Sequence, residues 1–508
     1  MTHEWILQTS FFWNSTPYEI DLGSSGITVK TDNYPFLSNF QPHVLGLRSC
    51  SVEGKIPDFI SGFRELAMLD LRNNSLTGEI PFWLFELPKL AYLDLSGNRL
   101  QGVLPPVLRL RPFRFIPPFL NLSSNNLQGP LPLLFKGIEL LLLSENNFTG
   151  EIPAIIGQHL SSARYISLSG NKLSGEIPHS LFQPNNVLQS LDLSNNELSG
   201  MVPSSLGNCD SLVYLNLANN TFTGSLPSEL GYANNLRTLQ LNNNQLNGPL
   251  PDSIWHLQSM EFLILGNNNF NGGIPQSLGN LSNLRILVLR SNSFSGPIPN
   301  EITPLQNLQF IDLAHNKFSG PIPTRLGNFK MLTQRPKERV LLGYIVLLTV
   351  AGVELEIVTK GSAQWLPLVF SQNSRIDLSD NTIEGDIPTE AGWLQGLYML
   401  NLSKNAITGS IPSNFGNMSG LESLDLSFNS LDGKIPDSLA SLDYLSVLNL
   451  AYNNLSGMVP SGRHFDTLSN EGLAYIGNPL LCGPPVMRSC PWAQDESNGE
   501  VEDGGEDA

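Results

Sequence analysis

Recurring carboxylates are the side chains in this sequence that could most readily perform chemistry. Two carboxylates that face one another can act as a general acid and a general base. The recurring carboxylates are aspartates, however, and each stands between the two inward-pointing apolar residues of one Leu-x-Leu-x-x-Asn motif. They are Asp70, Asp94, Asp192, Asp312, Asp377 and Asp425. One carboxylate per motif at a fixed place is a repeat feature, so we interpret them as solvated or turn-supporting residues.

Other catalytic and metal-binding patterns are missing from the sequence. The seven histidines are scattered without metal-ligand spacing, at positions 3, 43, 159, 179, 256, 315 and 464. No Gly-x-Ser-x-Gly, Gly-x-Gly-x-x-Gly or phosphate-loop motif is present. We therefore predict no catalytic residue, no metal and no cofactor. The net charge of -17 also argues against nucleic acid as a partner.

An internal repeat organises the chain and therefore positions any functional residues that it carries. The motif asparagine recurs in mostly 24-residue steps, at positions 74, 98, 125, 146, 171, 196, 220, 244, 268, 292, 316, 381, 405, 429 and 453. Cys50 takes the asparagine position one step before Asn74, and a weaker unit lies at 20–25. A single unit cannot bury its own leucines, so the units must stack. The pattern predicts a solenoid whose short parallel strands form the concave face.

The repeat consensus, Leu-x-x-Leu-x-Leu-x-x-Asn-x-Leu-x-Gly-x-Ile-Pro, resembles the plant-specific leucine-rich repeat. Its closing Gly-x-Ile-Pro is visible at 78–81, 150–153, 320–323 and 409–412. The step of 65 between positions 316 and 381 leaves an island of 41 extra residues, which four repeats and a cysteine-containing segment follow. This order resembles the ectodomain of a plant receptor-like protein. The resemblance implies an α/β-type solenoid, a right-handed superhelix with a parallel β-sheet on the concave face and a 3-10 or irregular convex side.

The resemblance also implies a domain order. We expect a degenerate repeat at 1–43, plant-type repeats at 44–331, the island at 332–372, four repeats at 373–460, a cysteine cap at 461–490 and an acidic juxtamembrane tail at 491–508. Family members begin with a signal peptide and a cysteine-paired cap, and they end with a transmembrane helix. This sequence has none of these, so we interpret it as truncated at both ends. The full-length protein is expected at the plasma membrane, on its extracellular face.

Cysteine and asparagine side chains fit an extracellular protein. We predict a disulfide between Cys482 and Cys490, which would cover the end of the last repeat. Cys50 and Cys209 are interpreted as buried structural thiols. Predicted glycosylation sites are Asn280 and Asn417, which are favoured by their convex setting, and Asn73, Asn147, Asn219 and Asn454.

The concave face is where we expect the ligand to bind. Most units carry Asp or Asn and then Ser or Ala there, whereas the units that end at positions 244 to 292 expose apolar and charged residues. Apolar and aromatic groups rimmed by arginines are typical of a protein-binding surface, although neutral drift is the alternative. The candidate contacts are Tyr165, Tyr214, Arg237, Gln240, Phe262, Ile264, Arg285, Val288, Arg290 and Phe310, with Lys360 and Trp365 from the island.

Two functions from different classes remain open. The first is a receptor ectodomain that recognises a peptide, protein or glycan, without a kinase of its own, and signals through co-receptor and adaptor receptor kinases, with defence as the expected process. The last four repeats would contact a somatic-embryogenesis-type co-receptor through Tyr398 and Met399. The alternatives are a soluble inhibitor of a secreted enzyme, of the polygalacturonase-inhibitor type, and the ectodomain fragment of a receptor kinase.

Overall fold

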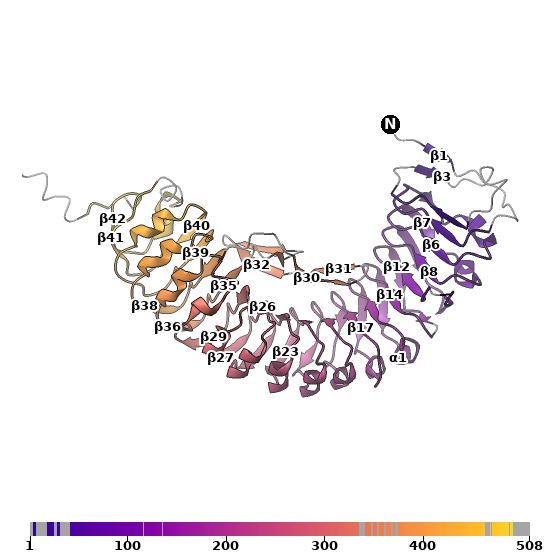
Figure 1. Ribbon diagram of the computed structural model, residues 1–508, viewed down its shortest axis with the longest axis horizontal. Coiled ribbons are helices and arrows are strands. Elements are labelled where there is room, and N and C mark those ends of the chain that lie inside the picture. Colours follow the sequence, from indigo (N-terminus) through magenta and orange to yellow (C-terminus); the bar gives the residue numbers. More distant parts are fainter. Residues whose placement is uncertain are drawn as a thin grey trace, which may run out of the picture. The chain divides into compact units, whose positions relative to one another are not determined.

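The computed structural model divides into two compact units, unit 1 (Met1–Met260) and unit 2 (Glu261–Ala508). Figure 1 shows stacked strands along both units, with short helices on the opposite side from the main sheet. The structure describes residues 4–6, 18–24, 28–30, 41–114, 116–134, 136–334, 341–346, 349–352, 355–359, 362–366, 369–370, 374–462, 468, 470–486 and 488–490.

The main sheet of unit 1 is built from one three-residue strand per repeat. Its strands are β2 (Glu19–Asp21), β4 (Val44–Gly46), β6 (Met68–Asp70), β8 (Tyr92–Asp94), β11 (Phe119–Asn121), β14 (Leu140–Leu142), β16 (Tyr165–Ser167), β18 (Ser190–Asp192), β20 (Tyr214–Asn216) and β22 (Thr238–Gln240). Each strand pairs in parallel with its neighbours along the chain, and equivalent residues face each other, as Leu69 faces Leu93.

Unit 2 continues the same design through the last repeats. Its main strands are β24 (Phe262–Ile264), β26 (Ile286–Val288), β28 (Phe310–Asp312), β35 (Arg375–Asp377), β37 (Met399–Asn401), β39 (Ser423–Asp425) and β40 (Val447–Asn449). β28 pairs directly with β35, so the island leaves the repeat register intact. The island contains β30 (Leu341–Val346), β31 (Thr349–Gly352), β32 (Leu355–Thr359), β33 (Ser362–Leu366) and β34 (Val369–Phe370), paired antiparallel.

A second set of strands follows the main strands in each repeat, which the sequence reasoning did not predict. In unit 1 these are β5 (Glu53–Gly54), β7 (Ser75–Glu79), β9 (Arg99–Val103), β12 (Asn126–Gly129), β15 (Asn147–Glu151), β17 (Lys172–Gly175), β19 (Glu197–Leu198), β21 (Thr223–Gly224) and β23 (Gln245–Pro249). In unit 2 they are β25 (Asn269–Gly272), β27 (Ser293–Pro297), β29 (Lys317–Gly320), β36 (Thr382–Asp386) and β38 (Ala406–Thr408). The repeated glycine ends or interrupts these strands because it adopts a positive φ, as at Gly224 (φ +76°).

Short helices close most repeats after the Pro of the Gly-x-Ile-Pro segment. Proline fixes φ near the helical value and lacks the N–H that a first turn leaves unpaired, so it favours a helix start. The 3-10 helices of unit 1 are η2 (Asp58–Gly62), η3 (Phe82–Glu86), η4 (His179–Phe182), η5 (Ser204–Asn208), η6 (Ser228–Tyr232) and η7 (Asp252–His256). Those of unit 2 are η8 (Gln276–Asn280), η9 (Asn300–Ile302), η10 (Leu326–Asn328), η12 (Thr389–Trp393), η13 (Ser413–Asn417), η14 (Asp437–Ser441) and η16 (Asn470–Tyr475).

A few elements depart from the repeat. They are β1 (Glu4–Ile6), β3 (Thr28–Lys30), β10 (Val107–Leu108), β13 (Leu133–Leu134), the single α-helix of the described residues α1 (Ile156–His159), and β41 (Ser456–Met458) with β42 (Leu480–Cys482) in the cap.

The core lies between the main sheet and the helices, and it is a stack of equivalent side chains. The middle residue of each main strand is buried, as Leu215 and Leu263 are at 0 % exposure. In unit 2, Phe270, Phe294 and Phe318 stack at 6.2 Å between ring centroids. The structure therefore confirms the predicted α/β-type solenoid with a parallel sheet.

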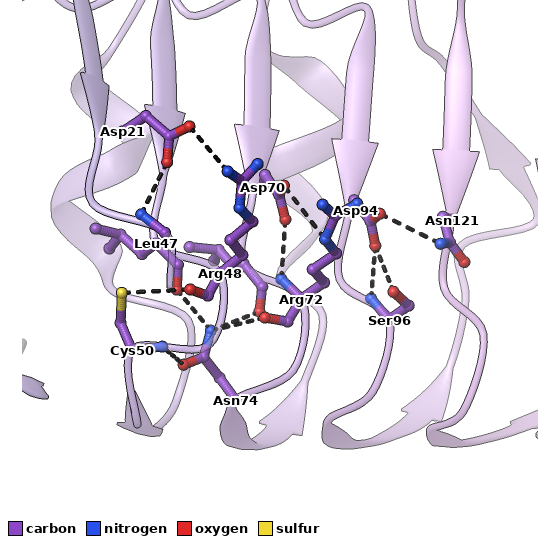
Figure 2. A network of polar contacts seen from close by, with 12 residues as sticks. Asp21, Leu47, Arg48, Cys50, Asp70, Arg72, Asn74, Asp94, Ser96 and Asn121 are labelled. Atoms are coloured by element: carbon purple, nitrogen blue, oxygen red, sulfur yellow. Dashed lines mark hydrogen bonds and ion pairs between the residues drawn. The ribbon is translucent and has the colours of Figure 1, made fainter. Parts of the chain in front are cut away.

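A ladder of buried asparagine side chains ties neighbouring repeats together. The Asn98 amide nitrogen donates to the carbonyls of Leu71 and Leu95 at 3.0 Å, and its amide oxygen accepts from the Leu76 N–H at 3.0 Å. Figure 2 shows how Cys50 replaces this side chain one step before Asn74. Its thiol donates at 3.3 Å to the Leu22 carbonyl and at 3.4 Å to the Arg48 carbonyl, which are longer and weaker bonds.

Candidate ligand-binding surface

The predicted ligand-contacting residues lie on the main sheets. In each three-residue strand the middle side chain enters the core, so the first and third lie on the opposite face, which we call the sheet side. The four aromatic residues each begin a strand: Tyr165 begins β16, Tyr214 β20, Phe262 β24 and Phe310 β28. Three residues end strands: Gln240 ends β22, Ile264 β24 and Val288 β26. The arginines lie just outside the strands, with Arg237 directly before β22, Arg285 directly before β26 and Arg290 after β26.

In unit 2 the structure brings the predicted apolar patch together. Phe262 lies opposite Ile286, which in turn lies opposite Phe310, and Ile264 lies opposite Val288. In unit 1, by contrast, Tyr165 and Tyr214 lie on either side of β18 and do not pair with each other. The predicted apolar contacts of unit 2 are therefore adjacent to one another. Unit 1 has a longer apolar run that sequence reasoning missed, formed at the first position of successive strands by Val44, Met68, Tyr92, Phe119, Leu140 and Tyr165.

The expected exposure of these residues is wrong for seven of them. Arg290 is 7 % exposed, Tyr214 5 %, Val288 4 % and Gln240 3 %, and Phe262, Ile264 and Phe310 are each 1 % exposed. Large side chains in register on strands about 4.8 Å apart cover one another's flanks.

A buried charged cluster lies beside this apolar patch. The Arg290 guanidinium pairs with the Asp312 carboxylate, with Nη1 3.3 Å from Oδ2. The guanidinium of Arg375 lies over the Phe310 ring, 4.8 Å from its centroid. Arg290 is 7 % exposed and Arg375, Asp312 and Asp377 are 2 % exposed or less. We refer to Arg290, Asp312, Arg375 and Asp377 as the charged cluster.

Burial shifts the proton affinity of the charged cluster. It raises the pKa of Asp312 to about 6, the nearby Asp377 carboxylate adds to the rise, and Arg290 opposes it. Burial likewise lowers the pKa of Arg375, although the two aspartates counteract this. The cluster therefore holds charges that an apolar environment disfavours.

Arg375 is the member of the cluster that sequence reasoning missed. Its Nε and one terminal nitrogen are buried without a hydrogen-bond partner among the described residues, and so is the Gln309 side-chain oxygen. Unpaired buried donors are costly, at about 1–3 kcal/mol each. A signal was available in the sequence, because Arg375 is a lone arginine at the first strand position directly after the island.

The recurring aspartates support turns, as the sequence predicted. The Asp94 carboxylate accepts from the backbone N–H and the hydroxyl of Ser96 at 3.0 and 2.6 Å, which Figure 2 shows. Asp425 binds Ser427 in the same way at 2.9 and 2.7 Å. A side chain that accepts two hydrogen bonds from its own turn has a structural role.

The last four repeats present a different surface from the one expected. Met399 is 4 % exposed, so it cannot serve as an exposed edge, and Tyr398 is half-buried. Burial raises the pKa of Tyr398, and the Glu422 carboxylate beside it adds to the rise. Met399 is buried because it begins β37 and packs between Arg375 and Ser423 on the adjacent strands.

Four aromatic side chains are exposed in these repeats instead, Trp393, Phe428, Tyr444 and Tyr452, and two of them stack on each other. Phe428 and Tyr452 are each 47 % exposed, and their rings stack with centroids 4.4 Å apart. Both have a positive φ, 53° and 56°, which is unfavourable for a bulky residue. Each stands directly before a ladder asparagine, where most repeats have Asn, Gly, Ser or a charged residue.

The structure shows the state of the four cysteines and the exposure of the sequon asparagines. The structure contains a disulfide between Cys482 and Cys490, and it buries both Cys50 and Cys209 as free thiols. Burial raises the pKa of Cys209 to about 12. Among the sequon asparagines, Asn73, Asn280, Asn417 and Asn454 are exposed, and Asn147 and Asn219 are half-buried.

Several predictions meet no test in the described residues. Lys360 lies outside them, and so does the side chain of Trp365. Within the described part of the chain, no three His, Cys, Asp or Glu side chains come close enough to hold a metal ion. The same part contains no helix that is both long and apolar enough to span a bilayer.

Family models for the leucine-rich repeat match more than half of the chain. The matched residues are 43–100 and 395–455 for one model, and 162–183, 187–209, 211–233, 235–257, 259–281, 283–305 and 307–329 for another. The chain belongs to the leucine-rich-repeat family. These models indicate no enzyme family, and a search of curated proteins found no match.

Solved structures similar to this leucine-rich-repeat chain include plant receptors. The Arabidopsis receptor kinase HAESA, in complex with the peptide hormone IDA and the co-receptor SERK1, is 32 % identical, with a TM-score of 0.74 over 92 % of this chain and 70 % of that one. The plant peptide hormone receptor RGFR1 with RGF2 is 26 % identical (TM-score 0.62, 92 % and 79 %), and a TDR receptor is 27 % identical (0.60, 92 % and 85 %).

The leucine-rich-repeat ladder also extends one rung further than the sequence predicted. The Asn478 amide nitrogen donates to the carbonyls of Leu450 and Tyr475 at 2.9 Å, and its oxygen accepts from the Leu455 N–H at 3.0 Å. Its distance of 25 residues from Asn453 is the signal that could have identified it.

Proposed function

We propose that this chain is the ligand-recognition ectodomain of a plant cell-surface receptor-like protein, and that it binds a peptide or protein on the sheet side of unit 2. Support comes from the similarity to HAESA, RGFR1 and TDR, two of which are described as bound to a peptide hormone. Apolar residues and arginines on one rigid sheet are suited to such a ligand.

The observation that carries this proposal is that two of the three guanidinium nitrogens of Arg375 have no hydrogen-bond partner among the described residues. Its free N–H groups and the free oxygen of Gln309 would hydrogen-bond a ligand group that both accepts and donates, such as a carboxamide. Because Arg375 is 1 % exposed, binding requires that the side chains covering it move aside. We therefore expect an association rate below the usual 10⁵–10⁷ M⁻¹s⁻¹ range of protein complexes.

A co-receptor kinase would bind the last four repeats. HAESA was solved with the co-receptor SERK1 bound, which makes a co-receptor of that type the natural candidate. We place the contact on Phe428 and Tyr452, because two exposed stacked aromatic rings offer large apolar area at low conformational cost. Tyr398, which is half-buried and directly precedes β37, remains a second candidate.

The test is ligand-dependent association between this chain and the SERK1 ectodomain, measured by biolayer interferometry with fractions of secreted plant peptides. We expect at least one fraction to increase association. Arg375→Gln should lose the response to the fraction, whereas Phe428→Ser with Tyr452→Ser should lose association while retaining binding of the active peptide. Arg99→Gln, an exposed substitution in β9, is the matched control. Failure of every fraction, or an Arg375→Gln chain that responds normally, would count against the proposal.

The enzyme-inhibitor alternative makes a different prediction. An inhibitor would reduce the activity of a secreted polygalacturonase without any co-receptor present. Adding the purified chain to that enzyme tests it directly, and lost activity would favour the alternative. Defence as the process served stays a prediction, which immune outputs in plants that express the chain would test.

A further inference from the structure

A cleft opens in unit 1 where the repeat loses its regular spacing. The step from Asn98 to Asn125 is 27 residues and the next one is 21, instead of 24. In the described residues of these two repeats, no 3-10 helix follows the second-sheet strand, and the pair β10–β13 takes that place. η3 of the preceding repeat therefore lacks its usual neighbour, and a cleft of about 510 Å³ lies between η3 and the segment 106–111.

The walls of this cleft combine flat apolar surface with charge. Phe82 and Phe85 come from η3, and Val107 from β10 faces them. Phe82 is 57 % exposed and Val107 44 % exposed, although both are large apolar residues. Arg109 and Arg111 supply two guanidinium groups to the same cleft.

These guanidinium groups are available to a ligand. No ion pair or side-chain hydrogen bond engages Arg109 or Arg111 within the described residues, whereas the backbone N–H of Arg111 holds the segment to the Leu90 carbonyl at 3.0 Å. Three arginines fall within the six residues 109–114 of a chain whose net charge is -17. The positive charge is thus concentrated locally, against the overall charge.

We propose that this cleft binds a small organic anion with a flat apolar body and one acidic group. Its volume lies in the 300–1,000 Å³ range of small-molecule sites. Guanidinium groups bind carboxylates and sulfonates through paired N–H donors, and an aromatic body can pack on the Phe82 ring. Glu86 at the rim would repel a second acidic group. The site is separate from the sheet side, so it does not depend on the proposed receptor function.

The test uses 8-anilino-1-naphthalenesulfonate as the probe and N-phenyl-1-naphthylamine, which lacks the sulfonate, as its neutral counterpart. In fluorescence titrations of the 508-residue chain, we expect the sulfonate probe to bind at least tenfold more tightly than the neutral probe. Arg109→Gln with Arg111→Gln should remove that preference, and Phe82→Ser should weaken both probes. Glu86→Gln should strengthen the sulfonate probe.

Arg99→Gln is the control, since it removes an exposed positive charge outside the cleft. Circular dichroism of each variant excludes misfolding. Equal affinity for the two probes in the unsubstituted chain would overturn the proposal. So would a sulfonate preference that survives the double arginine substitution, because the binding site would then lie elsewhere.

Discussion

Exchanging the ladder residues at positions 50 and 98 tests how the repeats are held together. Asn98→Cys introduces a thiol at a ladder position in the middle of unit 1, as Cys50 provides one at the edge of unit 1. Cys50→Asn does the reverse and restores the ladder side chain. Both substitutions keep a small polar group at the same position, so they isolate the hydrogen bonds.

The magnitude follows from the bonds that each residue makes. Asn98 is 9 % exposed, donates to two carbonyls at 3.0 Å and accepts from the Leu76 N–H at 3.0 Å. A thiol offers one weak donor, so the Leu76 N–H and one carbonyl would remain unpaired at about 1–3 kcal/mol each. We expect Asn98→Cys to cost about 2–6 kcal/mol. Cys50→Asn should add about 0.5–1.5 kcal/mol, because the thiol already bonds the Leu22 and Arg48 carbonyls weakly.

Urea unfolding followed by circular dichroism measures the free energy of unfolding, and amide hydrogen exchange at Leu76 reports the broken bond itself. Asn98→Cys should speed exchange at Leu76 more than at amides of unit 2. An Asn98→Cys chain within 0.5 kcal/mol of the unsubstituted one, with Leu76 still protected, would refute the assignment of stability to the ladder.

Three further predictions concern charge, glycans and the cap. Burial raises the pKa of Asp312 to about 6 in the folded chain. The stability that this raised pKa contributes is fully present below about pH 4 and is lost, by roughly 3 kcal/mol, as pH rises through 6. Asp312→Asn should flatten this pH dependence in thermal unfolding. Asn280 and Asn417 should carry glycans in a secreted product, so their replacement by Gln should each remove one glycan mass. Cys482→Ser should cost about 2–3 kcal/mol, measured as faster proteolysis of the cap beyond Met458, while β24 to β37 stay resistant.

The repeat architecture could be predicted because each unit repeats the same physical constraints. Leu263 and its equivalents are buried in every repeat, and a ladder asparagine follows every main strand from β6 to β40. A period read from the sequence therefore gives strand direction, register and core in one step. The second sheet was missed because its strands, such as β5 (Glu53–Gly54), are as short as two residues and have no alternating pattern of their own.

Exposure on the sheet side could not be predicted in the same way. Strand alternation says that Phe262 and Phe310 face away from the core, but it does not say what else covers them. Arg375 covers Phe310 from the next strand of the sheet, although 65 residues separate them in the chain. Such contacts depend on where the island interrupts the repeat, and no local pattern records that.

A chain of equivalent units contains its own reference, and this makes departures from the repeat interpretable. Phe428 adopts a positive φ that costs roughly 1–3 kcal/mol where most repeats have a residue better suited to it. Arg375 is buried with unpaired donors at the strand position where Ser190 has a small side chain. Val107 lies in a strand where a 3-10 helix would close the repeat. Restoring the consensus residue at any of these positions would improve local stability. The property that most directly offsets the lost stability is therefore binding.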